Sequence, residues 1–424
     1  MFRRTRCCSL LAVVGLLLFS RSVSAAKPAG PWNVQALKQT PEATWEEPEG
    51  DATEADAPKT ETPETGALVQ KVFYTSEPFE GQPTRVFAYY ARPKEGEGPF
   101  PGMVLVHGGG GKAFAEWATR WAERGYAALA MDLSGRGPDG ERLEDGGPDQ
   151  DDKTKFRAFN DGEVNQMWTY HAVAAVIRGH SLLASRQEVD AQRIGITGIS
   201  WGGYLTCIVA GLDDRVKVAV PVYGCGFLDQ DSVWLPTFER MAAEQRQRWV
   251  RNFDPSRYLS RANCPMLFVN GTNDFAYPLD SYQRSYQLVP GGVELCVRVK
   301  MPHSHPDGWG PKEIGIYVDS VLRQGRPLAQ LEPLEVVRDG VRASFTSSVR
   351  VTEGNVHYAV GEGPWKDRTW VTRPAVLAGG TVSAELPTFR PLVCYLSITD
   401  QRGAMVSTPH VVFEKPAGRL AAEQ

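Results

Sequence analysis

Residues 193–203 read RIGITGISWGG, and this stretch decides the fold. Residues 193–197 form a strand-like run and a helix-like run begins at Trp201, so the G-x-S-x-G pattern falls in the turn between them. The turn needs glycines on both sides because a Cβ would collide with neighbouring backbone. It lifts the hydroxyl of Ser200 above the sheet edge, where the positive end of the next helix also points. We therefore predict that Ser200 is a nucleophile.

Strand-like and helix-like runs alternate around this turn, from about residue 69 to residue 325. The predicted strands are residues 69–73, 85–91, 103–106, 126–131, 193–197, 216–222, 265–269 and 295–300, and the predicted helices are residues 113–124, 163–184, 201–210, 282–288 and 312–322. The alternation predicts an α/β fold with a mostly parallel sheet covered by helices on both faces. Catalytic groups are then expected at the carboxyl ends of the strands.

The texture of the chain changes after Pro327. Short strand-like runs follow at residues 335–338, 341–345, 356–360, 370–372, 382–386, 395–398 and 411–413, with turn signals between them. They predict a small all-β sandwich of the immunoglobulin-like kind over residues 327–424. A packing or spacer role is the leading interpretation of this domain, and carbohydrate binding is the alternative.

The N-terminus has the order of a secretory signal. Arg3, Arg4 and Arg6 precede an apolar run at residues 10–19 and small residues at 22–26, so residues 1–25 are predicted to be a cleaved signal peptide. Residues 41–65 hold nine acidic residues and four prolines, so residues 26–66 are predicted to be a flexible acidic leader. Residues 67–326 then form the catalytic domain of a secreted or periplasmic protein.

Charge and composition exclude several classes of partner. The chain has 46 Lys and Arg against 50 Asp and Glu, which leaves no positive field to attract nucleic acid. No apolar run of about 20 residues exists, so no stable membrane insertion is expected once the signal is removed. Five cysteines follow residue 25 without a CxxC pattern, and the sequence leaves open whether any pair.

A serine nucleophile needs a histidine base and a carboxylate that orients it, in the chain order Ser, acid, His. Asp274 follows the strand that ends at residue 269 and is the predicted acid. Asp280 is the competitor, but it lies further from the strand end and beyond Pro278.

Two histidines, His303 and His305, follow the last predicted strand of this domain. A catalytic histidine needs a few residues of loop to swing back over the serine, and Pro306 would fix the chain just after the second one. We therefore predict His305 as the base, with His303 beside it in a supporting place. The H-x-H-x-D spacing could also indicate a metal site, but it lacks the further adjacent histidine of zinc hydrolases, so no metal is predicted.

Negative charge on the attacked carbonyl oxygen needs backbone donors, and the run HGGGG at residues 107–111 follows the third predicted strand where such a loop belongs. The predicted oxyanion hole consists of the amides of Gly109 and Trp201. A phosphate-binding loop is disfavoured because Ala113, not Ser or Thr, follows Lys112, and Val106 stands where a glycine is needed. No cofactor is predicted.

The segment VDAQRIGI at residues 189–196, the GISWGG turn and GTNDFAYP at residues 271–278 together resemble the α/β-hydrolase superfamily. Within it the chain is similar to the dienelactone hydrolase, acetyl xylan esterase and prolyl-oligopeptidase-like branch, over roughly residues 85–325. The resemblance implies a metal-free hydrolase of carboxylic esters, with acyl groups on carbohydrate as the expected substrate. Serine replaces the cysteine of dienelactone hydrolase, and too few residues precede the first strands for an oligopeptidase propeller.

These residues predict acyl transfer through an acyl-enzyme. His305 takes the proton of Ser200, the Gly109 and Trp201 amides hold the oxyanion, and Asp274 stabilises the imidazolium. The substrate class is a small-molecule or carbohydrate ester. The alternatives are a secreted serine peptidase of the oligopeptidase branch and a non-catalytic binding protein on the same scaffold.

Overall fold

The computed structural model describes residues 30–46, 66–338 and 340–414. The predicted signal peptide and most of the predicted acidic leader lie outside these residues. Within them, no helix is long and apolar enough to cross a membrane.

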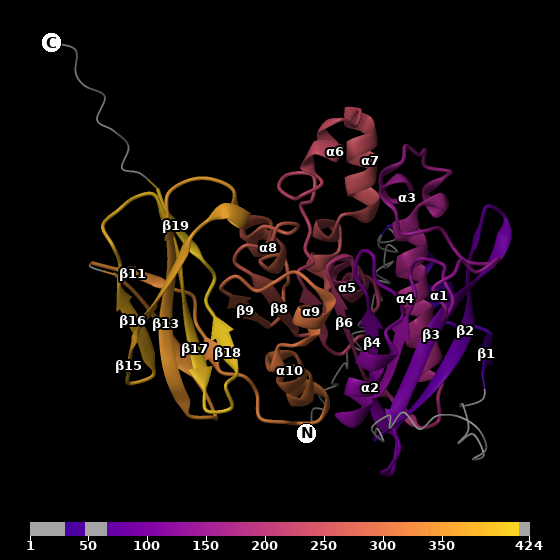
Figure 1. Ribbon diagram of the computed structural model, residues 1–424, viewed down its shortest axis with the longest axis horizontal. Coiled ribbons are helices and arrows are strands. Elements are labelled where there is room, and N and C mark those ends of the chain that lie inside the picture. Colours follow the sequence, from indigo (N-terminus) through magenta and orange to yellow (C-terminus); the bar gives the residue numbers. More distant parts are fainter. Residues whose placement is uncertain (1–29, 47–65, 339, 415–424) are drawn as a thin grey trace, which may run out of the picture.

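A nine-stranded sheet forms the body of the molecule, in the order β1-β2-β3-β5-β4-β6-β7-β8-β9 (Figure 1). The first four strands in this order pair antiparallel, and all pairs from β5 onward are parallel. The strands are β1 (Ala43–Trp45), β2 (Ala67–Phe79), β3 (Gln82–Pro93), β4 (Phe100–Val106), β5 (Ala127–Met131), β6 (Val189–Ile199), β7 (Ala219–Val222), β8 (Met266–Gly271) and β9 (Val293–Arg298). The predicted mostly parallel sheet is confirmed.

Helices cover both faces of this sheet. Every residue of β5, β7 and β8 is buried, which requires cover on both sides because successive side chains point to opposite faces. The helices of this layer are α2 (Ala115–Glu123), α4 (Trp168–Ala184), α5 (Trp201–Leu212), α8 (Leu279–Tyr286) and α10 (Lys312–Leu322). Three further helices, α3 (Asp152–Phe156), α6 (Leu235–Glu239) and α7 (Ala243–Phe253), stand at the upper edge of the view in Figure 1.

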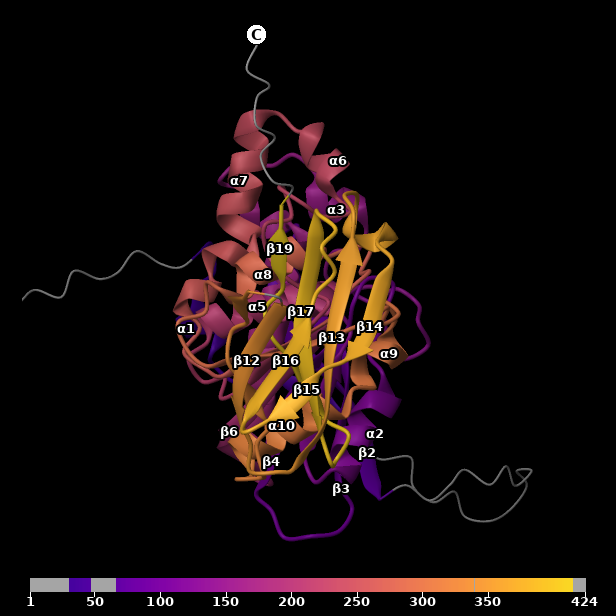
Figure 2. The same ribbon diagram turned by 90° about the vertical axis from the view of Figure 1, so that its left-hand side faces the viewer.

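The C-terminal part consists of two antiparallel sheets of five strands each, as the sequence predicts (Figure 2). One contains β10 (Gln330–Leu331), β11 (Glu335–Val337), β12 (Gly340–Thr346), β15 (Val376–Ala378) and β16 (Thr381–Glu385). The other contains β13 (Val351–Val360), β14 (Trp370–Pro374), β17 (Leu392–Asp400), β18 (Met405–Ser407) and β19 (Val411–Phe413). Alternate residues of β17 face opposite ways, so one set packs inside the sandwich and the other, including Val393 and Tyr395, packs toward the nine-stranded sheet.

Residues 30–46 correct the prediction of a flexible leader. They form α1 (Val34–Leu37) and β1, and β1 pairs with β2. The Trp32 indole is 3% exposed and donates a 2.9 Å hydrogen bond to the carbonyl of Tyr170. Trp45 packs edge-on against Tyr90 at 5.4 Å. The two tryptophans and Leu37 supply the apolar area that the acidic residues 47–65 lack, so this part of the segment can repay its ordering entropy.

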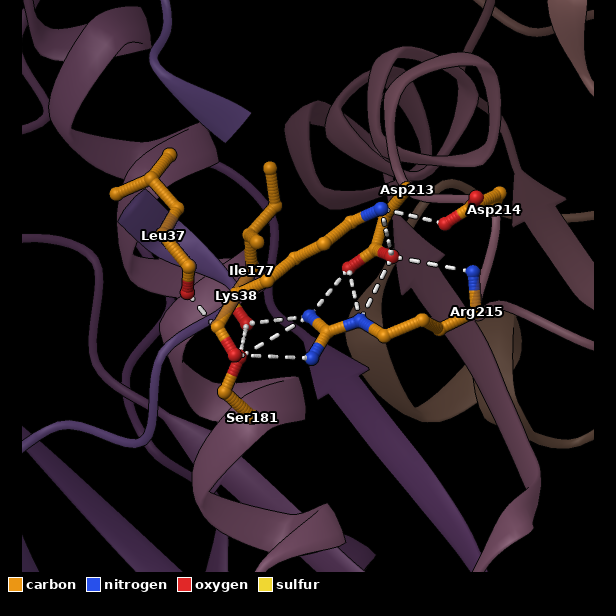
Figure 3. A network of polar contacts seen from close by, with 7 residues as sticks. All are labelled: Leu37, Lys38, Ile177, Ser181, Asp213, Asp214 and Arg215. Atoms are coloured by element: carbon orange, nitrogen blue, oxygen red, sulfur yellow. Dashed lines mark hydrogen bonds and ion pairs between the residues drawn. The ribbon is translucent and has the colours of Figure 1, made fainter. Parts of the chain in front are cut away.

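A polar network holds the end of α1 against α4 and α5 (Figure 3). Asp213 is buried and accepts hydrogen bonds from Arg215, which hold its pKa below the ordinary value although burial opposes the shift. Lys38 lies 3.8 Å from the same carboxylate, and its carbonyl accepts from Arg215. Ser181 donates to the carbonyl of Leu37 at 3.1 Å. The network fixes residues 37 and 38 to α4 and to the end of α5.

Candidate active site

Ser200 lies at the turn between β6 and α5, as predicted, with φ 58° and ψ −117°. Its amide donates to the carbonyl of Val222 on the neighbouring strand at 2.8 Å. A Cβ on Gly198 would lie 2.2 Å from the carbonyl oxygen of Gly202, and one on Gly202 would lie 1.9 Å from that of Val106. The positive φ of Ser200 costs about 1–3 kcal/mol for a residue that carries a side chain. The close packing at Gly198 and Gly202 holds Ser200 in this conformation.

Asp274 is 3% exposed in the loop after β8, and its two carboxylate oxygens have different partners. Oδ1 accepts from the amides of Ala276 at 2.9 Å and Tyr277 at 2.8 Å. Oδ2 lies 2.6 Å from Nδ1 of His303, which donates because the carboxylate can only accept. The loop therefore fixes the carboxylate, and the carboxylate fixes one imidazole.

The imidazole of His303 is held between aromatic rings next to the serine turn. Tyr223 stacks on it at 4.5 Å, and Tyr223 directly follows Val222, which bonds the Ser200 amide. Phe275 contacts its ring at 4.9 Å while 52% of the Phe275 residue stays exposed. The Nδ1 bond to Asp274 leaves Nε2 as the ring nitrogen available for proton transfer.

His305 does not contact Asp274, in contrast to the prediction. Its Nε2 accepts a 2.9 Å hydrogen bond from the amide of Gly108, and its ring packs on Phe114 at 4.9 Å. Burial, followed by the imidazoles of His107 and His303, lowers the pKa of His305 to about 4. The neutral ring that this favours at pH 7 is the form that can accept a bond at Nε2.

The backbone between the two histidines explains why they separate. Ser304 is extended, with φ −145° and ψ 165°, and the helical backbone begins at the next residue, so the chain changes direction between the two histidines. Ser304 also caps helix α9 (His305–Trp309) by accepting from the Asp307 amide. Pro306 fixes the first helical turn rather than a loop, so His305 is turned toward the glycine run and His303 toward the acid.

The glycine run wraps closely around the serine. A Cβ on Gly108 would lie 2.9 Å from Cβ of Ser200, and one on Gly111 would lie 2.7 Å from Nε2 of His305. A Cβ on Gly109 would lie 3.1 Å from the Trp201 ring, so both residues predicted to form the oxyanion hole lie together beside Ser200.

His107 supports this run, a role that the sequence analysis did not assign. Nε2 of His107 accepts from the Leu133 amide at 2.8 Å, and Nδ1 lies 2.7 Å from the Gly108 carbonyl. Burial lowers the pKa of His107 to about 4, which keeps the ring neutral and able to make both bonds. The position of His107 directly before four glycines is the sequence feature that could have indicated this supporting role.

An aromatic cluster covers the start of α5. Trp201 packs against Trp234 at 4.5 Å and Phe156 at 5.9 Å, and the Lys155 ammonium lies 4.5 Å from its ring centroid. These partners come from α3 and from the segment before α6, which the sequence presented only as polar loops and a cap region. They bury Trp201, the residue that follows Ser200.

The other predicted candidates lie elsewhere. Asp280, the competing acid, faces Asp231, and burial and then this carboxylate raise the pKa of Asp231 to about 7. Among the described residues, no group of three or more His, Cys, Asp or Glu side chains could hold a metal ion. Cys207, Cys225, Cys264, Cys296 and Cys394 are all free and buried.

Comparisons with known proteins identify relatives of this chain. The acetyl xylan esterase (AXE1) family model matches residues 43–261, just over half of the chain, a range that includes Ser200 and ends before Asp274. Acetyl esterase Axe7A of Xylanibacter ruminicola is 25% identical over 224 residues, which are 50% of this chain and 51% of that protein. The chain therefore spans about half the length of this relative.

Two further matches extend the comparison. An Escherichia coli (strain K12) protein, whose name proposes it as a carboxymethylenebutenolidase, is 31% identical over 218 residues, 51% of this chain and 69% of that protein. The solved acetyl xylan esterase from Paenibacillus sp. R4 covers 68% of this chain and 92% of its own, with a TM-score of 0.52 and 22% identity, a likeness of fold. The chain thus has the α/β-hydrolase fold and belongs to the acetyl xylan esterase (AXE1) family.

Proposed function

We propose that this protein is a serine esterase that removes acyl groups, acetyl above all, from carbohydrate. The observation that carries the proposal is the 2.6 Å bond between Asp274 and His303 beside the turn that holds Ser200. The names of Axe7A and of the Paenibacillus enzyme support acetyl esters as the substrate.

His303 replaces His305 as the proposed base. Nε2 of His303 takes the hydroxyl proton of Ser200 while Oγ bonds to the ester carbonyl carbon, and the carbonyl electron pair moves to oxygen. The amides of Gly109 and Trp201 stabilise that oxyanion. The electron pair on the oxyanion then re-forms the carbonyl as the C–O bond to the sugar oxygen breaks, and the imidazolium, stabilised by Asp274, gives its proton to that departing oxygen.

Water completes the cycle on the acyl-enzyme. Nε2 of His303 accepts a proton from water as its oxygen attacks the acyl carbon, and the proton passes to Ser200 as the serine ester breaks. The products are the free hydroxyl of the sugar and a carboxylic acid.

His305 holds the oxyanion loop in this account. By accepting from the Gly108 amide it fixes the residue before Gly109, whose own amide is thereby aimed at the substrate oxygen. The proposed roles of the two histidines are therefore proton transfer for His303 and positioning for His305.

We further propose that the enzyme acts outside the cytoplasm. The basic residues Arg3, Arg4 and Arg6 and the apolar run at residues 10–19 support this location. Acylated polysaccharides too large to enter a cell are the substrates that such a location would suit.

The function is tested with the purified protein and its Ser200→Ala variant on p-nitrophenyl acetate, acetylated xylo-oligosaccharides and peptide amides. We expect the wild type to release acetate from the esters and leave the peptides intact, and Ser200→Ala to lose both ester activities. Peptide cleavage would place the protein with the serine peptidases. Absence of labelling by a fluorophosphonate would favour a non-catalytic binding protein.

A further inference from the structure

The loop that carries Asp274 is bonded directly to the C-terminal domain. Asn273, the preceding residue, points its side-chain amide nitrogen at three backbone carbonyls, at 3.4 Å from Trp365, 2.9 Å from Lys366 and 2.8 Å from Arg368. An amide nitrogen carries two hydrogens and can donate to this set, whereas a carboxylate could not. A single side chain thus links the predicted acid to a turn 92 or more residues further along the chain.

The same side chain also reaches the histidine loop. The Asn273 carbonyl oxygen accepts from the hydroxyl of Thr272 at 2.8 Å, and that hydroxyl accepts from the amide of Lys300 at 3.0 Å. Lys300 lies three residues before His303. The loops that supply the acid and the base are therefore joined to each other and to the C-terminal domain through one connected set of hydrogen bonds.

The turn that receives Asn273 is itself held firmly. It is a short 3-10 helix, Trp365–Asp367, in which Trp365 is nearly buried against His410 at 4.9 Å, with the Arg368 guanidinium 3.9 Å over its ring. The tryptophan belongs to a buried cluster across the domain boundary that includes Leu279 of α8 and Val297 of β9. The carbonyls that face Asn273 are thus fixed by packing on the catalytic domain.

A second contact lies at the same boundary, away from the acid loop. Ser407 of β18 accepts from the amide of Val297 at 3.0 Å, and Tyr395 donates to the carbonyl of Val297 at 3.2 Å. These bonds cover the edge strand β9, as the closeness of the yellow strands to β9 in Figure 1 also indicates. They hold the domains together without contacting Asp274.

We propose that the C-terminal domain is a positioning part of the catalytic site, acting through Asn273. The inference rests on the proposed function, because it assigns Asn273 the task of holding Asp274 against His303. Asn273 does not touch substrate and is a positioning residue. A domain that served only as a spacer or a carbohydrate-binding module would have no need of this bond.

The test compares Asn273→Ala, Asn273→Asp, Ser407→Ala and Ser200→Ala in the full chain on p-nitrophenyl acetate, a substrate too small to need a sugar-binding module. We expect Asn273→Ala to lower kcat about ten- to a hundredfold with KM nearly unchanged, because a small displacement of a catalytic group has effects of this size. Asn273→Asp keeps the volume but loses the donors, so its kcat should fall at least as far. Ser407→Ala removes a bond at the same boundary and should keep the wild-type kcat.

The pH profile separates positioning from simple loss of stability. A displaced Asp274 stabilises the imidazolium less, so the acid limb of kcat/KM should move to lower pH in Asn273→Ala and stay in place in Ser407→Ala. Wild-type kcat in Asn273→Ala, or an equal loss of kcat in Ser407→Ala and Asn273→Ala, would overturn the inference. Undiminished activity of Ser200→Ala would instead overturn the proposed function itself.

Discussion

His303 donates a 2.6 Å hydrogen bond to Asp274, although 29 residues separate them in the chain. His305, two residues after His303, accepts from the Gly108 amide instead. The two histidines therefore divide the site between them. In the proposed function, the histidine bonded to the carboxylate transfers the proton, and the other secures the loop that would bind the oxyanion.

Phe275 is expected to contribute to substrate binding rather than to stability. It is 52% exposed and contacts the ring of His303, the proposed base, so we expect it to touch a substrate bound there. Phe275→Ala should raise KM for aromatic or bulky esters about fivefold while kcat for p-nitrophenyl acetate changes little. Steady-state kinetics checks this, with thermal denaturation as a control that should show an unchanged Tm. A fall in kcat with constant KM would argue against the assignment.

Trp32 should carry much of the attachment of residues 30–46. Its buried indole contacts Tyr170, Phe253 and Tyr258 and donates a hydrogen bond. Trp32→Ala is expected to lower the free energy of unfolding by about 3 kcal/mol. Urea denaturation measures the change, and Gln35→Ala, at an exposed position of the neighbouring helix α1, should have little effect. Equal stability of the two variants would show that the segment adds nothing to the fold.

Stability should fall as the pH falls from about 6.5 to about 4. Burial lowers the pKa of His107, His171, His180, His305, His357 and His410 to about 4 in the folded protein. Within this window the unfolded chain binds more protons at these six histidines than the folded one, so their contribution to stability is fully present above the window and is lost as the pH decreases. Burial raises the pKa values of Asp132, Asp231 and Glu294 to about 6 or 7, and these three carboxyls act in the opposite direction but are fewer. Denaturation midpoints measured between pH 4 and pH 8 should follow this direction.

His180 offers a single-residue check of that effect. It is buried in α4, and neither ring nitrogen has a hydrogen-bond partner among the described residues. His180→Leu keeps a similar volume and removes the buried polar atoms, so it should stabilise the fold by about 1 kcal/mol, and more at pH 5 than at pH 8. If the difference in stability between His180→Leu and the wild type did not vary with pH, His180 would not contribute to the loss of stability at low pH.

The serine turn and the order of elements could be predicted because they depend on local patterns. The glycines around Ser200 are required because a Cβ at Gly202 would lie only 1.9 Å from the carbonyl oxygen of Val106. The sequence shows this requirement as the pattern G-x-S-x-G between a strand and a helix. Asp274 could be placed by the same kind of argument, as the acid that follows a buried strand. Its pairing with an imidazole in the structure agrees with that placement.

The choice between His303 and His305 depended on a conformation that the sequence did not reveal. The sequence suggests that Pro306 fixes the chain just after a loop that brings His305 over the serine, whereas in the structure it occupies the first turn of a helix capped by Ser304. The contact of Asn273 with residues 365–368 was likewise beyond sequence analysis, because nothing local shows which domain surfaces meet. Residues 30–46 are folded because Trp32 is buried and Trp45 is partly buried against the rest of the protein. The prediction of a flexible leader rested instead on the acidic composition of the segment.

The most direct test of the account compares His303→Ala with His305→Ala by kcat/KM on p-nitrophenyl acetate and by the rate of fluorophosphonate labelling of Ser200. If His303 is the base, its loss should lower both quantities at least about 10³-fold, whereas loss of His305 should cost about tenfold by displacing the oxyanion loop. The opposite order, with His305→Ala the more damaged variant, would contradict the assignment of the catalytic base.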